Sequence, residues 1–421
     1  MNAIKTIKSK NLRLVLLVSV AFLLPLSKLL VPFLILLIGV EWVFRKRWEK
    51  GFFDLTYLGF FALFFVYQLF SLTWSENWDY GGADIVAKLS LILFPLFLGT
   101  KDEDLDYMKI FEWFVYGTLV LLLINLGYGS WNYFQNKEPN AFFYSKLSPL
   151  FHVAYASMYC ILAIPLIYYF YLHGYKFFRN IWIASAIVSI EAIHVVLLNS
   201  KASFIAMMVV FLVILVYFIQ TKWFKQFIVP AVLVFVLSIG TLFSSEFLYV
   251  RFFGGFEIFK KKSEQTISNE FKEKKMEAEA EAPVVSSQVR VVAWSTAWEI
   301  IKLNPFGVGI GDRKDVFLEK VGNKGHKRFV DKGLNTHNQY LQVLLAIGIP
   351  GFLIFLLNLF YPIVDAFKGR DFILMAFMAN VSINLLFESM LEVQAGIIFY
   401  AFFAILLVKQ LKEEQFTFPK Q

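Results

Sequence analysis

The sequence is poor in cysteine and in charged residues, and both shortages narrow what the protein can be. One of its 421 residues is cysteine, so no disulfide can form within the chain. Asp, Glu, Lys and Arg make up 17% of residues, whereas average soluble domains carry about 25%. Hydrophobic residues make up 58% and include 49 Phe and 10 Trp. These numbers exclude a soluble enzyme, a disordered protein and a disulfide-rich secreted domain, and they predict an all-α membrane protein of many spans.

The sequence also lacks the spacings that are typical of metal and nucleotide sites. The five histidines are His152, His173, His194, His326 and His337. They lie on separate segments, without a His-x-x-x-His pair or a cysteine cluster, so we expect no metal and no cofactor. Gly307, Gly309 and Gly311 alternate with other residues, but no Gly-Lys-Ser/Thr follows them. They predict a tight turn whose backbone passes close to other structure.

Long apolar runs predict about twelve membrane-spanning helices, since one span needs about 20 apolar residues. The first run, Leu12–Phe44, is too long for one span and contains Pro25 and Pro32, so we divide it near Lys28. The other predicted spans are Phe52–Leu72, Ala83–Gly99, Lys109–Gly127, Pro149–Leu172, Ile181–Leu198, Ala202–Ile219, Phe224–Phe243, Gln339–Tyr361, Asp371–Phe387 and Gln394–Val408.

The distribution of lysine and arginine predicts the orientation of these spans. Basic residues gather in the segments on one side, which include both termini. The short loops on the other side hold only Lys28, Lys137, Lys146 and Lys201. The positive-inside rule therefore places both termini in the cytoplasm, and it explains the net charge of +8 without a nucleic-acid partner.

The predicted organisation is one integral membrane domain with a large external insertion. Residues 1–243 hold nine spans, residues 244–338 form an extracytoplasmic loop that contains helices, and residues 339–421 hold three spans and a cytoplasmic tail. Within the loop, Lys260–Glu281 has mixed charges that favour a solvated helix, with a partner-binding site as the alternative.

A second helix is predicted at Ser286–Leu303, where Asn-Pro ends it. Arg290, Trp294, Trp298 and Ile301 recur there at helical spacing and should share one face. Aromatic residues on an external helix suggest packing on the membrane surface or on the helix bundle. An arginine on such a face needs an anion, because a charge taken out of water must be paired.

Ionisable residues in or beside apolar segments are further candidates for a functional site. Glu191 and His194 lie three residues apart in a predicted span, and Glu388 borders the last external turn. Glu191 and His194 could satisfy each other within the bundle, or they could line a path for a substrate.

Four motifs follow one another along the external side of the chain. They are Asn199–Ser203, Arg290 with Trp294, Asn304–Gly309, and His337–Gln342 with Gly348 and Gly351 behind it. In this order, with one large external loop before the tenth span, they resemble the superfamily of O-antigen ligases and O-antigen polymerases. The detailed resemblance covers roughly Leu197 to Leu356.

The resemblance implies a glycosyltransferase of the bacterial inner membrane. Such an enzyme moves a glycan from an undecaprenyl-diphosphate carrier to an acceptor hydroxyl, such as one on lipid A-core, at the outer face and without a metal. Its external arginines and its histidine carry over to Lys201, Arg290 and His337, with Lys201 in place of an arginine. By this resemblance Arg290 and His337 are catalytic, and Lys201, Arg290, Trp294 and Asn338 bind diphosphate or glycan.

These residue types suit the chemistry. Fixed cations stabilise the negative charge that develops on a departing diphosphate. A histidine can take the proton of an acceptor hydroxyl, which is worth about 10²–10⁴-fold in rate. Lysine keeps the charge of arginine but loses its two-pronged hydrogen bonding.

Alternatives remain open at this point. The motifs do not separate a ligase from a polymerase, and they leave the acceptor and the sugars undefined. A transporter of lipid-linked sugars is the alternative from another class, favoured by Lys88, Glu191 and His194 in apolar segments. The gathering of polar residues at the outer face and the lack of an internal repeat favour the transferase. A membrane scaffold would leave Arg290 on its aromatic face unexplained.

Overall fold

The computed structural model describes residues 2–101, 105–138, 140–221, 224–243 and 286–417. Within these ranges the secondary structure is helical, apart from one β-bridge between Phe52 and Thr100. The charged segment Lys260–Glu281 lies outside the described residues.

The helices follow the apolar runs of the sequence. In the first half of the chain they are α1 (Asn2–Leu23), α2 (Leu30–Phe44), η1 (Arg47–Lys50), α3 (Leu55–Phe70), η2 (Ser71–Trp74), α4 (Trp78–Ala87), α5 (Ser90–Leu98), α6 (Tyr107–Asn136), η3 (Tyr144–Lys146), α7 (Val153–Leu172), η4 (Lys176–Arg179), α8 (Ile181–Leu198) and α9 (Lys201–Ile219). They continue with α10 (Phe224–Phe243), α13 (Ser286–Leu303), α14 (Arg313–Asn323), α15 (Lys327–Lys332), α16 (Gln339–Gly369), α17 (Phe372–Phe387), η6 (Met390–Glu392) and α18 (Gln394–Thr417).

Among the described residues, 8 helices are long and apolar enough to cross a membrane. Shorter apolar helices lie at Leu12–Leu23, Leu30–Phe44, Ala231–Thr241 and Phe372–Phe387. Every run that the sequence analysis assigned to a span overlaps one of these helices. The chain is therefore a polytopic helical membrane protein, while the full set of twelve spans stays a prediction.

Three interruptions shape these helices. The break between α1 and α2 falls around Lys28, as predicted, and α16 is broken at Gly348, which has φ 65° and ψ −166°. The third break was not predicted, because Ala83–Gly99 reads as one apolar run. The chain turns at Lys88 between α4 and α5, where the Lys88 ammonium joins a buried group of charges.

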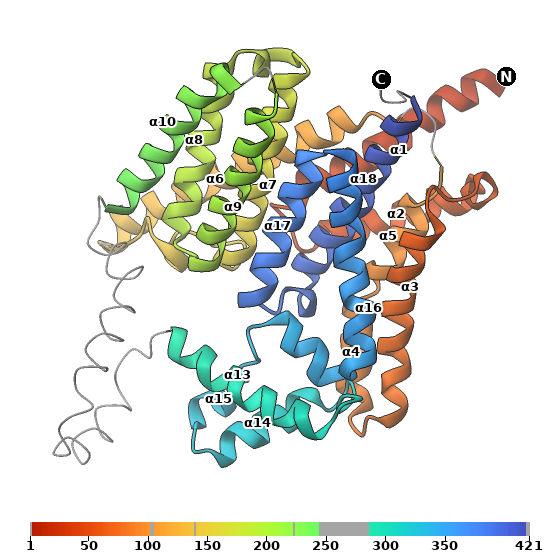
Figure 1. Ribbon diagram of the computed structural model, residues 1–421, viewed down its shortest axis with the longest axis vertical. Helices are drawn as coiled ribbons and strands as arrows, with labels where there is room; N and C mark the ends of the chain where they lie inside the picture. The colour runs from red at the N-terminus through yellow and green to blue at the C-terminus, as the bar shows by residue number, and fades with distance from the viewer. Residues whose placement is uncertain (1, 102–104, 139, 222–223, 244–285, 418–421) are drawn as a thin grey trace.

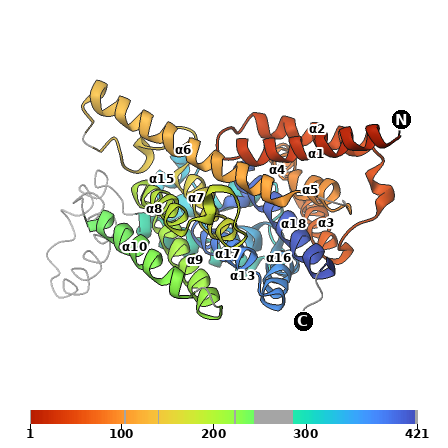
Figure 2. The same ribbon diagram turned by 90° about the horizontal axis from the view of Figure 1, so that it is seen from above.

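The bundle is built around α7, which is buried on all sides, and α18, which is nearly so. Helices α8 and α9 pack on α7, and α17 packs on α7, α9 and α16. Figure 2 shows α7 among α6, α8, α9 and α17, and it shows α6 extending across the assembly. Since nearly every side chain of α7 faces another helix, its sequence is apolar all round, as expected of a central helix.

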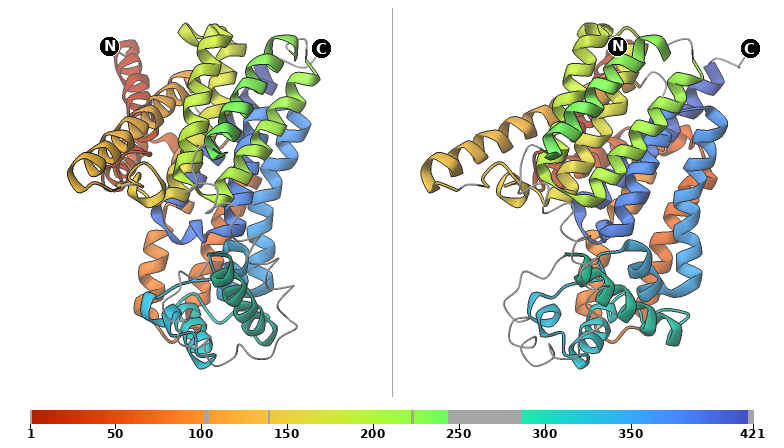
Figure 3. Two further views of the ribbon diagram at one scale, coloured as in Figure 1. Left: turned by 90° about the vertical axis from the view of Figure 1, so that its left-hand side faces the viewer. Right: turned by 60° about the vertical axis from the view of Figure 1, so that its left-hand side comes forward.

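Helices α13, α14 and α15 form a small layer of their own, here called the α13–α15 unit (Ser286–Lys332). It has a separate apolar core, to which Ala297, Ile300, Phe317 and Val321 contribute. Figures 1 and 3 show this unit at one end of the molecule and both chain termini at the other end. This is the arrangement that the predicted topology requires; which end faces the cytoplasm stays a prediction.

Candidate functional site

The last turn of α17 brings two of the predicted site residues to one carboxylate. Glu388 follows α17 directly. Its Oε2 lies 3.5 Å from His337 Nδ1, and its Oε1 lies 3.6 Å from Arg290 Nη2. Arg290 Nη2 also donates to the carbonyl of Phe387 at 3.2 Å. Glu388 is thus the anion that Arg290 needs on an apolar helix face. We call Arg290, His337 and Glu388 the outer triad.

Local backbone chemistry holds His337 in place. His337 has φ 48°, and its N–H donates to Asn335 Oδ1 at 2.9 Å. The following residue, Asn338, is buried and caps α16, because its Oδ1 accepts from Leu341 N at 3.1 Å. Trp294 Nε1 donates to the Thr336 carbonyl at 3.0 Å. The helix cap and the Trp294 bond fix the turn that carries the imidazole.

Helix α13 confirms most of the predicted face. The Trp294 ring lies 6.3 Å from that of Phe387, which ties the helix to the bundle, and Ile301 is buried in the α13–α15 unit. Trp298 differs, because its side chain is 49% exposed. The aromatic face therefore splits between the bundle and the surface.

Lys201 begins α9, whose first turn lies beside the last turn of α17. Asn199 adopts a left-handed conformation, and Ser200 caps the helix by accepting from Ser203 N. Ser203 Oγ contacts Asn384 Oδ1 at 3.1 Å, and Asn384 stands one helical turn before Glu388. Lys201, the third predicted cation, therefore lies near the same end of α17 as the outer triad. Its side chain is partly exposed.

The charges around Glu388 keep it ionised. Burial favours its neutral form, but a hydrogen bond from His337 and the charges of His337, His152 and Arg290 outweigh this effect. Together they hold the pKa of Glu388 below its ordinary value of 4.5. A carboxylate at this place can accept the Nδ1 proton of His337 and leave Nε2 free to act as a base.

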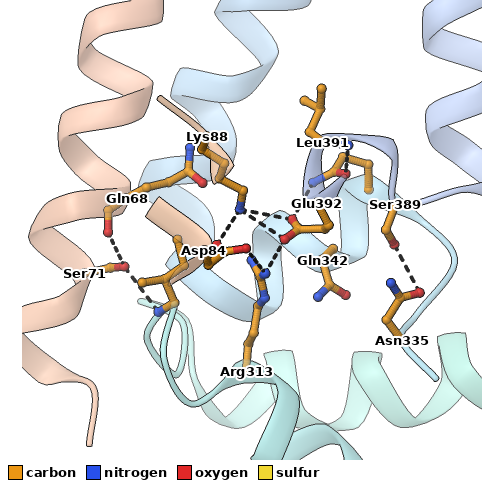
Figure 4. Close-up of polar contacts among 12 residues, drawn as sticks. Gln68, Ser71, Asp84, Lys88, Arg313, Asn335, Gln342, Ser389, Leu391 and Glu392 are labelled. Carbon is orange, nitrogen blue, oxygen red and sulfur yellow. Dashed lines mark hydrogen bonds and ion pairs between the residues drawn. The ribbon is translucent and has the colours of Figure 1, made fainter. Parts of the chain in front are cut away.

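A second group of charges lies beside the outer triad and was not predicted as a unit. Arg313 Nη2 lies 2.7 Å from Asp84 Oδ1 and also contacts Glu392. Lys88 Nζ lies 2.8 Å from Asp84 Oδ2 and 3.1 Å from Glu392 Oε2. Gln339 Nε2 donates to Glu392 Oε1 at 3.0 Å. Figure 4 shows Asp84, Lys88, Arg313 and Glu392 pointing toward one another. We call Asp84, Lys88, Arg313 and Glu392 the ion cluster.

The glycine-rich segment locks the α13–α15 unit to the bundle, as the predicted tight turn suggested. Val308 N and Gly309 N donate to the carbonyls of Leu345 and Ala346, both at 2.9 Å. Ile349 N donates to Pro305 O at 2.8 Å, across the break in α16. A Cβ at Gly348 would lie 2.3 Å from the Phe306 carbonyl carbon. Glycine is required there because two backbones cross at contact distance.

Family comparison fits this geometry. Residues 183–356 match the model of the O-antigen ligase family. The resemblance to the O-antigen ligase and polymerase superfamily is confirmed. A search of curated proteins found no match. The match includes Lys201, Arg290 and His337, and it ends where the predicted resemblance ends. The enzyme class that the family implies is a glycan ligase or polymerase, in a bacterial membrane.

Sequence reasoning missed two residues of the ion cluster: Arg313, which lies within the region that matches the ligase family, and Asp84, which lies before it. Arg313 sits in a hydrophilic stretch that reads as an external loop, although its side chain is 2% exposed. One signal was available: Asp84 and Lys88 stand four residues apart in an apolar run, and such a pair rarely stays alone within a membrane.

A cavity of about 120 Å³ lies between the ion cluster and the turn that carries His337. Tyr80, Lys314, Asn335 and Gln342 line it, together with Arg313 and Glu392. Because Asn335 lines the cavity and its Oδ1 accepts from His337 N, the cavity adjoins the turn that carries His337. Figure 4 shows Asn335 and Gln342 below Glu392 at this place.

Glu191 and His194 contact other helices of the bundle. Glu191 Oε1 accepts from Thr118 Oγ1 at 2.7 Å, and His194 Nε2 lies 2.9 Å from Asn125 Nδ2. Both partners belong to α6. His194 Nδ1 lies 3.4 Å from Cys160 Sγ of α7. Their predicted place on a substrate path stays a prediction.

Proposed function

We propose that the protein transfers a glycan from an undecaprenyl-diphosphate carrier to an acceptor hydroxyl at the outer face of the inner membrane. The observation that carries the proposal is the meeting of Arg290 and His337 at Glu388, beside the N-terminus of α9 with Lys201. The group lies at the end of the bundle where the α13–α15 unit docks, opposite the chain termini (Figure 1).

Arg290 and Lys201 serve the donor. The leaving group is a lipid diphosphate, which departs with negative charge. Arg290 is held by only one carboxylate at 3.6 Å and one carbonyl, and its Nε is buried without a hydrogen-bond partner among the described residues. The side chain of Arg290 is 22% exposed, and a guanidinium held in place with part of its surface accessible is suited to a phosphate oxygen.

His337 serves the acceptor. The acceptor oxygen attacks the anomeric carbon, and the bond from that carbon to the phosphate oxygen breaks, with its electron pair leaving on the diphosphate. The hydroxyl proton passes to Nε2 of His337, while Glu388 steadies Nδ1. A single displacement of this kind inverts the anomeric carbon. The cavity beside the turn that carries His337 offers polar groups to a glycan, and Asn338 acts by capping α16 beneath the imidazole.

A polymerase that extends the lipid-linked glycan uses the same chemistry and is the second candidate. The two differ in the acceptor, so deletion in the source bacterium separates them. Loss of attached full-length polymer indicates a ligase, and shortening to single repeats indicates a polymerase. The transporter alternative loses one support, because Lys88 is paired in the ion cluster.

The test is glycan transfer by purified protein, with a lipid-linked glycan as donor and the natural acceptor. We expect His337→Ala to lower kcat by about 10²–10⁴-fold. We expect Arg290→Lys to retain more activity than Arg290→Ala, because the charge remains. His326→Ala is the matched control, since His326 is exposed in the same external segment. Full activity of a folded His337→Ala variant would refute the base role, and flipping without transfer would favour a transporter.

A further inference from the structure

Three metal-binding side chains meet inside the bundle, away from the outer triad. Cys160 lies on α7, and Glu191 and His194 lie on α8. One donor atom from each lies within 4.8 Å of the other two, and all three side chains are fully buried. Cys160 Sγ is 3.4 Å from His194 Nδ1, which is 4.0 Å from Glu191 Oε2. The sequence showed no such site because its residues come from two helices.

The carboxylate in this group is incompletely satisfied. Glu191 Oε1 accepts from Thr118, but Oε2 has no hydrogen-bond partner among the described residues. Oε2 lies 4.0 Å from His194 Nδ1, and a carboxylate oxygen of Glu191 lies within 4.8 Å of both the sulfur and an imidazole nitrogen. A carboxylate inside a membrane bundle is costly unless a positive charge or a proton compensates it. Among the described residues His194 forms an ion-pair contact with this carboxylate, with Nδ1 4.0 Å from Oε2.

The neighbouring amide can accept a hydrogen bond from Nε2–H of His194, which would leave Nδ1 unprotonated. Asn125 Nδ2 lies 2.9 Å from His194 Nε2, while Asn125 Oδ1 is buried without a partner among the described residues. Turning the amide by 180° brings Oδ1 onto Nε2–H and moves the amide nitrogen to the place without a partner, so either orientation leaves one amide atom unpaired among the described residues. His194 Nδ1 then presents a lone pair toward Cys160 and Glu191. Metal-bound histidines are oriented by hydrogen bonds of this kind.

We propose that Cys160, Glu191 and His194 bind a zinc ion that joins α7 to α8. Thiolate, imidazole and carboxylate are all ligands that Zn²⁺ takes in tetrahedral sites. With a thiolate, a carboxylate and a neutral imidazole, the divalent ion gives a site without net charge, which suits a buried place in a membrane. Binding converts the thiol to a thiolate, and its proton leaves to solvent. Water fills the fourth position.

This ion has a structural role. It lies on α6, α7 and α8, whereas the transfer chemistry lies on α13, α16 and α17. The proposal is therefore independent of the proposed function. Because the site is enclosed, the ion enters before the bundle closes and exchanges slowly afterwards.

The experiment uses full-length protein, expressed with zinc or cobalt in the medium and purified in detergent without chelator. We expect about one zinc ion per chain by elemental analysis. Cobalt-grown protein should show a sulfur-to-cobalt charge-transfer band in the near ultraviolet. The assignment of that band is unambiguous, because Cys160 is the only cysteine in the sequence.

Matched variants distinguish zinc bound at this site from zinc bound adventitiously elsewhere. Cys160→Ala and His194→Ala should lose the charge-transfer band and the zinc. Ser157→Ala, a fully buried change on the same helix, should keep both, as should His337→Ala. Zinc that persists in folded Cys160→Ala, or cobalt bound without the band, would mean adventitious binding elsewhere and overturn the proposal. Metal-free protein of normal stability would overturn it too and leave a hydrogen-bonded network.

Discussion

Glu388 and Glu392 stand four residues apart, yet they belong to two groups of charges that differ in their surroundings. Glu392 belongs to the ion cluster, where Arg313, Lys88 and Gln339 all contact its carboxylate. Glu388 belongs to the outer triad, where His337 and Arg290 stand 3.5 and 3.6 Å away. Arg313 is 2% exposed in the first group, whereas His337 is 30% exposed in the second.

The two groups differ in how closely their opposite charges approach one another and in how exposed their side chains are. The ion cluster holds two cations and two anions that form close ion pairs with one another, and each of the four side chains is at most 9% exposed. The outer triad is looser and more accessible, since its ion pairs are 3.5 and 3.6 Å long and the side chains of Arg290 and His337 are 22% and 30% exposed. The ion cluster, which is buried, anchors the α13–α15 unit. The outer triad, which is partly exposed, can bind an incoming anion. The following experiments test this division.

The largest effect is expected from Arg313→Met, which leaves Asp84 and Glu392 buried with one cation. Removing one partner of a buried ion pair costs about 3–5 kcal/mol. Lys314→Met is the control, because Lys314 is the exposed neighbour on the same helix. Thermal unfolding in detergent measures both. Equal stability of the two variants would show that the ion cluster is not an anchor.

Gly348→Ala tests the second anchor, the crossing of the glycine-rich segment with α16. At φ 65° an alanine costs about 1–2 kcal/mol from conformation alone. The contact with the Phe306 backbone adds to this. Gly82→Ala is the control, since nothing lies within 4 Å of the added methyl group. We expect protease cleavage within Ser286–Lys332 to rise for Gly348→Ala and to stay unchanged for Gly82→Ala.

Trp294→Phe should have a smaller effect, because it keeps the ring beside Phe387 and removes one hydrogen bond. The loss of the Nε1 bond to the Thr336 carbonyl costs about 0.5–1.5 kcal/mol. Since this bond holds the turn before His337, kcat should fall more than the donor KM rises. Trp298→Phe, at the exposed position of the same helix, should change neither. A matching loss in both variants would remove the positioning role of Trp294.

Glu388→Gln should have the smallest effect on stability, at most about 1 kcal/mol, because the triad is partly exposed. The lowered pKa of Glu388 sets its pH window. A carboxylate of depressed pKa stabilises the folded state above its unfolded value and ceases to do so as pH falls through the folded value. The difference between wild type and variant should therefore hold from pH 8 to pH 5 and shrink below 4.5. A difference that grows in acid would contradict the ionised state of Glu388.

Local signals were read correctly from the sequence. The helix Ser286–Leu303, its end at Asn-Pro and the interruption at Gly348 were predicted, because periodicity, proline and glycine act within a few residues. The sequence left open whether Trp298 packs on the membrane surface or on the bundle, since helical spacing tells which residues share a face and not what covers each part of it; its side chain is 49% exposed.

Contacts between distant segments could not be read in the same way. The turn at Lys88 depends on Glu392 and Arg313, which lie hundreds of residues further along the chain. Likewise, Cys160 meets His194 only because α7 and α8 pack side by side. Without an account of which helices are neighbours, each of these residues reads as an isolated polar side chain in an apolar run.

Composition and the length of the apolar runs determined that this is a helical membrane protein, because burying so much apolar surface without lipid is impossible for a monomer in water. The order of the motifs indicated the resemblance to the O-antigen ligase family, whose model matches residues 183–356. Only the tertiary structure decided that the charges of the ion cluster are buried in close ion pairs and that those of the outer triad are partly exposed. That outcome depends on the few ångströms between side chains of different helices, and sequence spacing does not encode such distances.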